Sequence, residues 1–362
     1  MRRRGGMILL IIAGALIAGY GTAYVASEDV RYLTRAGIEQ TVILEARQPI
    51  AKILQDPATT PATRQSLQLV LDARDFAATL GFKAGQTYTT YANVGRDTLL
   101  LVLSASPRNC LCPHLWKYPI VGRIPYKGFF DPKMARKESA RLEARGYDVY
   151  LRPAGAFSTL GWFNDPLYST AMSEDSVELV ATVLHEISHN TLYVKSATPF
   201  NESFAQLSGY RAAEAFFRQR GSTEAADRAA RRWLDEVVLS GYYTELSRRL
   251  DSVYATTTDS VAIDAGRAAM GRWAREQLQG PIGAQLGTYT IGPMADRPIN
   301  NARLIAATIY RERLDLLERW YQEHGRDIAM SVRALSDLMQ GVPGDSAYAR
   351  LAAAEGDSVA VH

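Results

Sequence analysis

The most informative residues for function form a short motif that begins at His185. His185-Glu186-Ile187-Ser188-His189 is an H-E-x-x-H motif, in a stretch whose apolar residues recur at helical intervals. Residues four apart lie on one face of a helix, so His185 and His189 can bind a single metal ion. Glu186 lies beside these ligands, where its carboxylate can take a proton from a metal-bound water. The motif predicts a catalytic metal site with Glu186 as general base.

A third ligand must come from another segment, and Glu202 is the candidate. Thr198 can cap a new helix with Pro199 at its first position, which leaves Glu202 in the first turn. The chain between His189 and Glu202 is long enough to end one helix, turn and return antiparallel, so the carboxylate can face both imidazoles. Two histidines and one glutamate with an open position are typical of catalytic zinc. We therefore expect one Zn²⁺ per chain.

The hydrophobic pattern predicts the helices and strands that hold these residues in place. Helices are predicted over 30–54 and 63–80, and a buried strand over 98–103. Asp131 and Pro132 should begin a helix that stops at Gly146, before a strand over 148–151. Beyond residue 173 the pattern is helical, over about 176–195, 199–219, 223–253, 258–279 and 301–340. The expected fold class is α+β and mostly helical, with a small sheet in the first half.

This pattern divides the chain into three parts. Residues 1–29 form a signal or anchor segment, and residues 30–342 form one catalytic domain. Within that domain we expect a helical N-terminal region (30–90), a sheet-containing part (91–172) and a helical part with the zinc site (173–342). Residues 343–362, which are rich in Ala, Gly, Ser and Asp, are expected to be a flexible tail.

The N-terminal segment indicates where the protein acts. Arg2, Arg3 and Arg4 precede an uncharged apolar run from Met7 to about Ala26, which reaches the length needed to span a bilayer. Arginines stay on the cytoplasmic side, so the rest of the chain would lie outside the cytoplasm. We expect an inner-membrane anchor with the catalytic domain in the periplasm. Cleavage after Gly21-Thr22-Ala23, and thus export, is the alternative.

Charge and cysteine content exclude other classes of protein. The formal charge of +3, from 41 basic and 38 acidic side chains, is too near neutral for a nucleic-acid-binding surface. Cys110 and Cys112 are too few for a disulfide framework, and a ring closed by the C-x-C spacing would be tight. We expect two packed thiols. The sequence does not indicate an oligomeric state.

The motifs at residues 185–189 and 201–205 together resemble those of a known class of peptidases. His185-Glu186-x-x-His189 followed by Asn201-Glu202-x-x-Ala205 is similar to the H-E-x-x-H plus N-E-x-x-A pattern of the gluzincin peptidases. The short gap between the motifs, with segments 118–122, 146–150, 158–163 and 300–304, makes the chain resemble the bacterial family named "Putative aminopeptidase". The likeness runs from about residue 30 to 340.

The resemblance implies a gluzincin-like zinc metallopeptidase that takes a peptide substrate and is an aminopeptidase. Gluzincins use a Tyr or His downstream of the ligands to stabilise the oxyanion, which makes Tyr310 the first candidate and His324 the second. By analogy, segment 158–163 would belong to or flank the strand that pairs with substrate. Asp165 could then bind the substrate's α-amine.

Two alternatives stay open at this point. The first is a zinc endopeptidase, because the G-x-M-E-N exopeptidase motif of the large aminopeptidases is absent. The second is a non-catalytic envelope scaffold in which a structural zinc only joins two helices. Glu186 argues against the scaffold, since a structural site does not require a general base.

Overall fold

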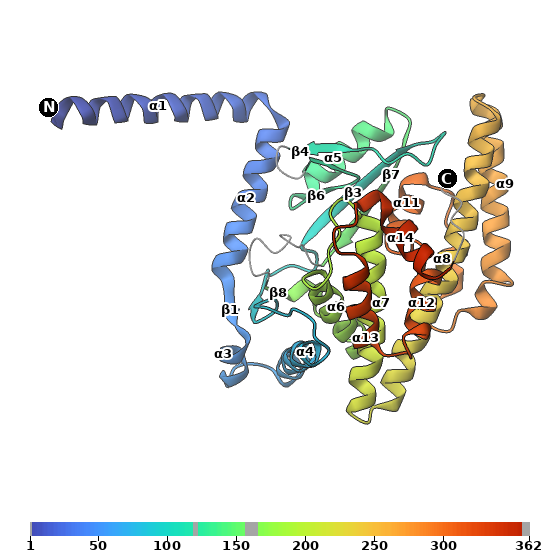
Figure 1. Ribbon diagram of the computed structural model, residues 1–362. Coiled ribbons are helices and arrows are strands. Elements are labelled where there is room, and N and C mark those ends of the chain that lie inside the picture. The colour runs from blue at the N-terminus through green and yellow to red at the C-terminus, as the bar shows by residue number, and fades with distance from the viewer. Residues whose placement is uncertain (1, 119–121, 156–165, 357–362) are drawn as a thin grey trace.

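The computed structural model describes residues 2–118, 122–155 and 166–356. It is 65% helical and has a small three-stranded sheet in its first half, which confirms the mostly helical α+β class. Helix α1 (Arg2–Ala26) projects from the body, and α2 (Glu28–Ala46) follows at an angle to it along one side (Figure 1). Among the described residues, no helix is both long and apolar enough to cross a membrane.

The remaining elements divide between a half that contains the strands and a helical half. The first half holds β1 (Arg47–Pro49), α3 (Ile50–Gln55), α4 (Pro61–Thr79), β2 (Thr90–Ala92), β3 (Leu100–Pro107), β4 (Trp116–Tyr118), β5 (Gly122–Ile124), β6 (Lys127–Phe129), α5 (Pro132–Glu143), β7 (Tyr147–Ala154) and β8 (Leu167–Tyr168). The second half holds η1 (Ser169–Ala171), α6 (Ser176–His189), α7 (Thr198–Gln219), α8 (Thr223–Thr256), α9 (Ser260–Gln279), η2 (Gly283–Gln285), α10 (Ile291–Ala295), α11 (Asn301–Ile309), α12 (Leu314–Glu323), α13 (Ile328–Leu338), η3 (Gly344–Ser346) and α14 (Ala347–Ala354).

The two strands predicted from short apolar runs pair with each other. β3 lies between β6 and β7 and is antiparallel to both, with Leu103 opposite Leu151. As predicted, the Asp131 side chain caps α5, which begins at Pro132. Leu142 of α5 and Leu103 of β3 belong to one buried cluster, so α5 covers one face of this sheet.

Two of the predicted helices are interrupted. The region 30–54 divides into α2 and α3, because residues 47–49 pair with β2 instead of continuing the helix. The region 301–340 divides into α11, α12 and α13. Arg313, Gly325 and Arg326 adopt positive φ angles of 48°, 71° and 58°, which end a right-handed helix.

The C-terminal segment corrects the expectation of a flexible tail. Residues 347–354 form α14, and Ala347, Leu351 and Ala352 are buried in the largest hydrophobic core together with α6 and α7. Three alanine or leucine side chains at helical spacing are enough to bury one face of a short helix. The segment therefore belongs to the domain.

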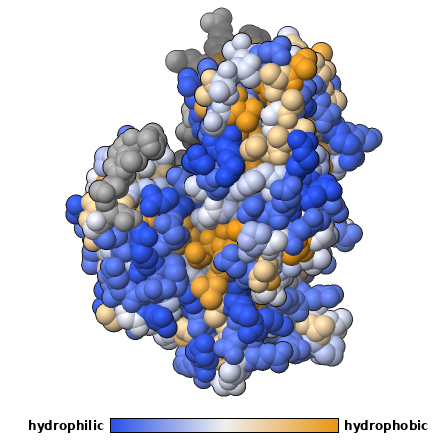
Figure 2. All heavy atoms as spheres, turned by 90° about the vertical axis from the view of Figure 1, so that its right-hand side faces the viewer, coloured by the Kyte–Doolittle hydropathy of each residue, from blue (hydrophilic) through white to orange (hydrophobic). Residues whose placement is uncertain are grey.

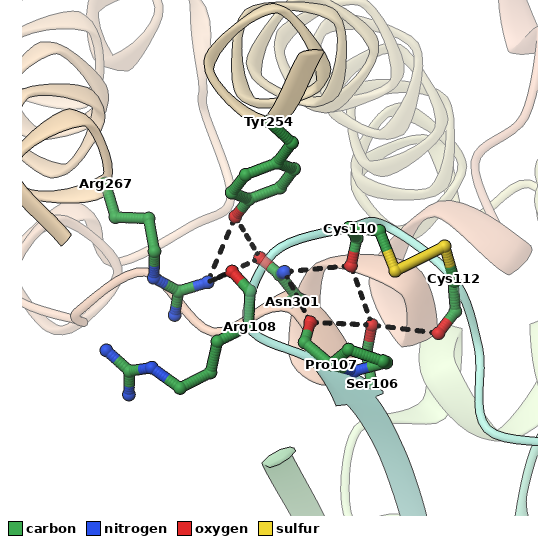
Figure 3. Close-up of a disulfide and its surroundings, with 8 residues drawn as sticks. All are labelled: Ser106, Pro107, Arg108, Cys110, Cys112, Tyr254, Arg267 and Asn301. Atoms are coloured by element: carbon green, nitrogen blue, oxygen red, sulfur yellow. Dashed lines mark hydrogen bonds between the residues drawn. A yellow bond between two sulfur atoms is a disulfide. The ribbon is translucent and has the colours of Figure 1, made fainter. Parts of the chain in front are cut away.

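The cysteine expectation was also wrong, because Cys110 and Cys112 form a disulfide (Figure 3). The loop after β3 brings their Cα atoms to 5.3 Å, within the range that a disulfide can bridge. Both cysteine carbonyls accept hydrogen bonds of 3.0 Å from the Ser106 hydroxyl, which holds this loop in a tight turn.

The face that carries α8 and α9 is mostly hydrophilic, and apolar side chains gather near its centre (Figure 2). A second hydrophobic core joins these two helices to α10 and α11, with Leu246, Leu278 and Leu304 among its buried members. The helical half thus contains two cores, one around α6 and α7 and one around α8 and α9.

Candidate active site

Helices α6 and α7 form an antiparallel hairpin that carries both sequence motifs. Asn201 fixes the connecting loop, because its side chain accepts from the Val194 N–H and donates to the Val194 carbonyl, both at 2.8 Å. Gly209 lets the helices come close. A Cβ there would lie 2.7 Å from the Ala181 carbonyl oxygen and 3.2 Å from the Cβ of His185.

The hairpin brings the three predicted ligands together. Nε2 of His185 lies 3.4 Å from Oε2 of Glu202, and Nε2 of His189 lies 3.8 Å from the same oxygen. One donor atom from each residue lies within 4.8 Å of the other two, and within the described chain no other three potential ligands lie so close together. Bonds of about 2.0–2.2 Å from one ion to three tetrahedrally arranged atoms require separations of this size. The donor set and its spacing therefore fit zinc.

Protonation of the metal-free site is set by burial and by the carboxylates. Burial alone would lower the pKa of His185, but Glu202 and Glu186 raise it above its ordinary value. Burial and the neighbouring His185 lower the pKa of His189 to about 4. Burial alone would raise the pKa of Glu202, but the hydrogen bond between Glu202 and His185 lowers this pKa below its usual value. His189 and Glu202 are thus in their metal-binding forms at neutral pH.

Glu186 and Tyr310 face one small cavity next to the ligands. The cavity has a volume of about 200 Å³, and His185, Gln206 and Glu178 also line it. Tyr310 follows the last residue of α11 and is partly buried. Burial, together with the charges of Glu202 and Glu186, raises the pKa of its phenol, which therefore stays protonated and can donate a hydrogen bond.

Three side chains near the site were not predicted from the sequence. Gln206 lies one turn after Glu202 on α7, and its side chain hydrogen-bonds His185. Arg152 on β7 and Tyr126 between β5 and β6 both lie close enough to Glu202 to interact with its charge. The i, i+4 spacing from Glu202 could have indicated Gln206. Nothing in the local sequence marks Arg152 or Tyr126, because the sheet brings them to the site.

The other sequence candidates lie elsewhere. His324 follows α12, where Nδ1 lies 2.7 Å from the Trp320 carbonyl oxygen and the ring packs on that of Trp320. Segment 158–163 and Asp165 lie outside the described residues.

A buried polar network holds the first turn of α11, and thereby the helix that ends at Tyr310 (Figure 3). Asn301 donates from its amide to the carbonyls of Pro107 at 2.9 Å and Cys110 at 3.0 Å. Its side-chain oxygen accepts from Tyr254 and from Arg267. Arg267 also donates to Asp148 of β7 at 2.6 Å, which joins α9, α11 and the sheet.

The helical hairpin carries two imidazoles, one carboxylate as the third potential ligand and an adjacent glutamate, and these are the features of a metal-dependent hydrolase site. The model of the family described as "Putative aminopeptidase" matches residues 31–346, and the chain belongs to that family. The comparisons with curated proteins and with solved structures found no match. Family membership supports a peptidase, a hydrolase that cleaves peptide bonds.

Proposed function

We propose that this protein is a zinc-dependent aminopeptidase. The observation that carries the proposal is that His185, one of the three clustered ligand candidates, lines the same cavity as Glu186 and Tyr310. A structural zinc site would need neither the general base nor a buried phenol aimed at the same space.

Each residue has a distinct role in peptide hydrolysis. His185, His189 and Glu202 would hold zinc, which when bound acidifies water and polarises the substrate carbonyl. Glu186 accepts the proton of the attacking water and delivers it to the nitrogen of the leaving amine. The Tyr310 hydroxyl donates a hydrogen bond to the carbonyl oxygen as negative charge develops there.

The size and charge of the small cavity support removal of single N-terminal residues. Glu178 lies two turns before His185 on α6, about 10 Å along the helix axis, and lines the same cavity. Its carboxylate accepts from Tyr210 at 3.1 Å and lies 3.3 Å from the Arg232 guanidinium, and these contacts fix its position. We assign Glu178 to the α-ammonium group of the substrate.

The metal assignment is tested by elemental analysis of the purified full chain. The wild type should hold one zinc ion, and His185→Ala, His189→Ala and Glu202→Ala should each lose most of it. Glu186→Gln should keep the zinc and lose turnover by at least about 10²-fold, because the amide has the same shape but cannot accept the proton. Full zinc retention by Glu202→Ala would contradict the ligand set, and an unchanged rate in Glu186→Gln would contradict peptidase chemistry.

The specificity is tested with a peptide that has either a free or an acetylated N-terminus. Mass spectrometry should show loss of single residues from the free form only. Glu178→Gln should raise the KM of the free peptide about tenfold without loss of zinc, whereas Glu174→Gln, at an exposed position near the start of α6, should leave it unchanged. Cleavage inside the acetylated peptide would reassign the enzyme as an endopeptidase.

We also propose that the catalytic domain acts outside the cytoplasm, held to the inner membrane by its N-terminal segment. The support is the order of Arg2–Arg4 and the uncharged run to Ala26, together with a disulfide of the kind that persists in oxidising compartments. The protein should sediment with membranes and resist extraction by high salt. A mature N-terminus at Tyr24 would show cleavage and export instead.

A further inference from the structure

A second, larger cavity adjoins the candidate active site. Its volume is about 580 Å³, which is in the range of sites that hold small ligands. Gln206 and Tyr310 line both this cavity and the small one, so the two spaces lie on either side of these residues. β7, α8, α10 and α11 provide most of the other walls.

The charged side chains that line this larger cavity are all positive. Four arginines line it, Arg152, Arg297, Arg303 and Arg311, and its described lining includes no aspartate or glutamate. Arg311 is neutralised, because its Nε lies 2.6 Å from a carboxylate oxygen of the buried Glu236. The other three make no ion pair with a described carboxylate, although Arg152 lies close enough to Glu202 to interact with its charge.

Arg303 and Arg297 have no carboxylate within ion-pair distance in the described part of the chain. Arg303 donates to the Pro298 carbonyl. Burial and the like charge of Arg297 lower the pKa of Arg303, which shows that its surroundings favour the loss of positive charge. Arg152 likewise has no ion pair with the described residues. It shares one face of β7 with Tyr150, which also lines the cavity.

Arg303 and Arg152 are partly buried without an ion pair, which is unfavourable, and a bound anion removes that cost. A carboxylate matches its planar donors and accepts two parallel hydrogen bonds. The apolar and aromatic walls, with Leu246, Tyr242 and Met294 among them, suit the carbon chain of an amino-acid residue.

We propose that this cavity binds the part of the peptide beyond the scissile bond and selects a carboxylate there through Arg303, Arg297 and Arg152. This inference rests on the proposed peptidase function. The carboxylate is either an acidic side chain or the free C-terminus of a short peptide. In either case the preferred substrates carry a carboxylate in the part of the peptide beyond the scissile bond.

The test uses four forms of the tetrapeptide Leu-Ala-Glu-Ala with the zinc-loaded full chain. The third residue is Glu or Gln, and the C-terminus is a free acid or an amide. We expect kcat/KM to be at least tenfold higher for a peptide with the selected carboxylate than for the doubly neutral form. If the Glu peptides are preferred over the Gln peptides, the cavity selects the acidic side chain. If the free acids are preferred over the amides, it selects the C-terminus.

Variants connect the preference to the cavity. Arg303→Gln should reduce the ratio of kcat/KM between carboxylate and neutral peptides to about one. Arg297→Gln, at an exposed position that folding tolerates, should reduce it several-fold. The control Arg275→Gln removes an exposed arginine that pairs with Asp296 and does not line the cavity, so it should keep the wild-type ratio. Equal kcat/KM values for all four peptides, or an unchanged ratio in both Arg303→Gln and Arg297→Gln, would overturn the inference.

Calorimetry separates this inference from the proposed function. Glu186→Gln should bind the carboxylate peptide at least tenfold more tightly than the neutral peptide, and the double variant with Arg303→Gln should lose that difference. If the wild type hydrolyses no peptide and this binding preference is present, the peptidase proposal fails and the anion site stands. Equal binding of both peptides would overturn the anion site.

Discussion

At the residue scale, Tyr310 is the side chain whose chemistry depends most on its surroundings. Its hydroxyl is buried near Glu186 and Glu202, and both carboxylates favour the neutral phenol. A neutral phenol can donate a hydrogen bond to an oxyanion and adds no charge to the substrate complex. The donor is therefore most effective in the transition state.

Tyr310→Phe should lower kcat by about 10²–10³-fold and leave the zinc content unchanged, because only the oxyanion donor is lost. Tyr126→Phe is the matched comparison, since its hydroxyl is also near Glu202 but does not line the small cavity. The measurement is steady-state kinetics with a free-amine peptide. A fall in kcat that is no larger for Tyr310→Phe than for Tyr126→Phe would remove Tyr310 from the oxyanion site.

At the scale of elements, the close packing of α6 on α7 sets the distance between the histidines and Glu202. Gly209 is the contact point, with no room for a methyl group between it and the Ala181 carbonyl. Separation of the helices there would move His185 away from the carboxylate that lies 3.4 Å from its Nε2. Helix packing and metal affinity are thus coupled at one residue.

Gly209→Ala should destabilise the protein by about 1–3 kcal/mol, because the added methyl forces the helices apart, and should weaken zinc binding. Gly241→Ala in α8 is the control. A Cβ there meets no atom within 4 Å, so the substitution should stabilise by about 0.5–1 kcal/mol through helix propensity. Denaturant unfolding and zinc titration measure both effects. Equal stability of the two variants would contradict the packing argument.

At the scale of the whole molecule, the network around Asn301 joins the sheet to the helical half. Asp148 is 7% exposed and Arg267 5%, so their ion pair is shielded from water. Asp148 also accepts from the Asn301 N–H at 2.7 Å. α14 makes a second long-range connection, because the Phe200 ring on α7 packs edge-on against Tyr348.

Arg267→Met should destabilise the protein by about 3–5 kcal/mol, because it leaves the buried Asp148 without its main counter-ion. Arg248→Met breaks an exposed pair with Glu245 and should leave the stability nearly unchanged, because water screens that pair. Thermal unfolding of the two variants measures the difference. A cost for Arg267→Met no larger than that for Arg248→Met would show that the network does not stabilise the fold.

Local patterns were sufficient to predict much of this protein. The H-E-x-x-H spacing, the cap at Asp131 and the helical periodicity depend on residues within a few positions of one another, so the sequence alone determined the ligand candidates and most helices. Contacts between distant segments decided the rest. Arg152 reaches the site because β7 pairs with β3, and α14 folds because the core around α7 offers it an apolar surface. The cavity of arginines exists only where β7, α10 and α11 converge, since burial and unbalanced charge are properties of the packed chain.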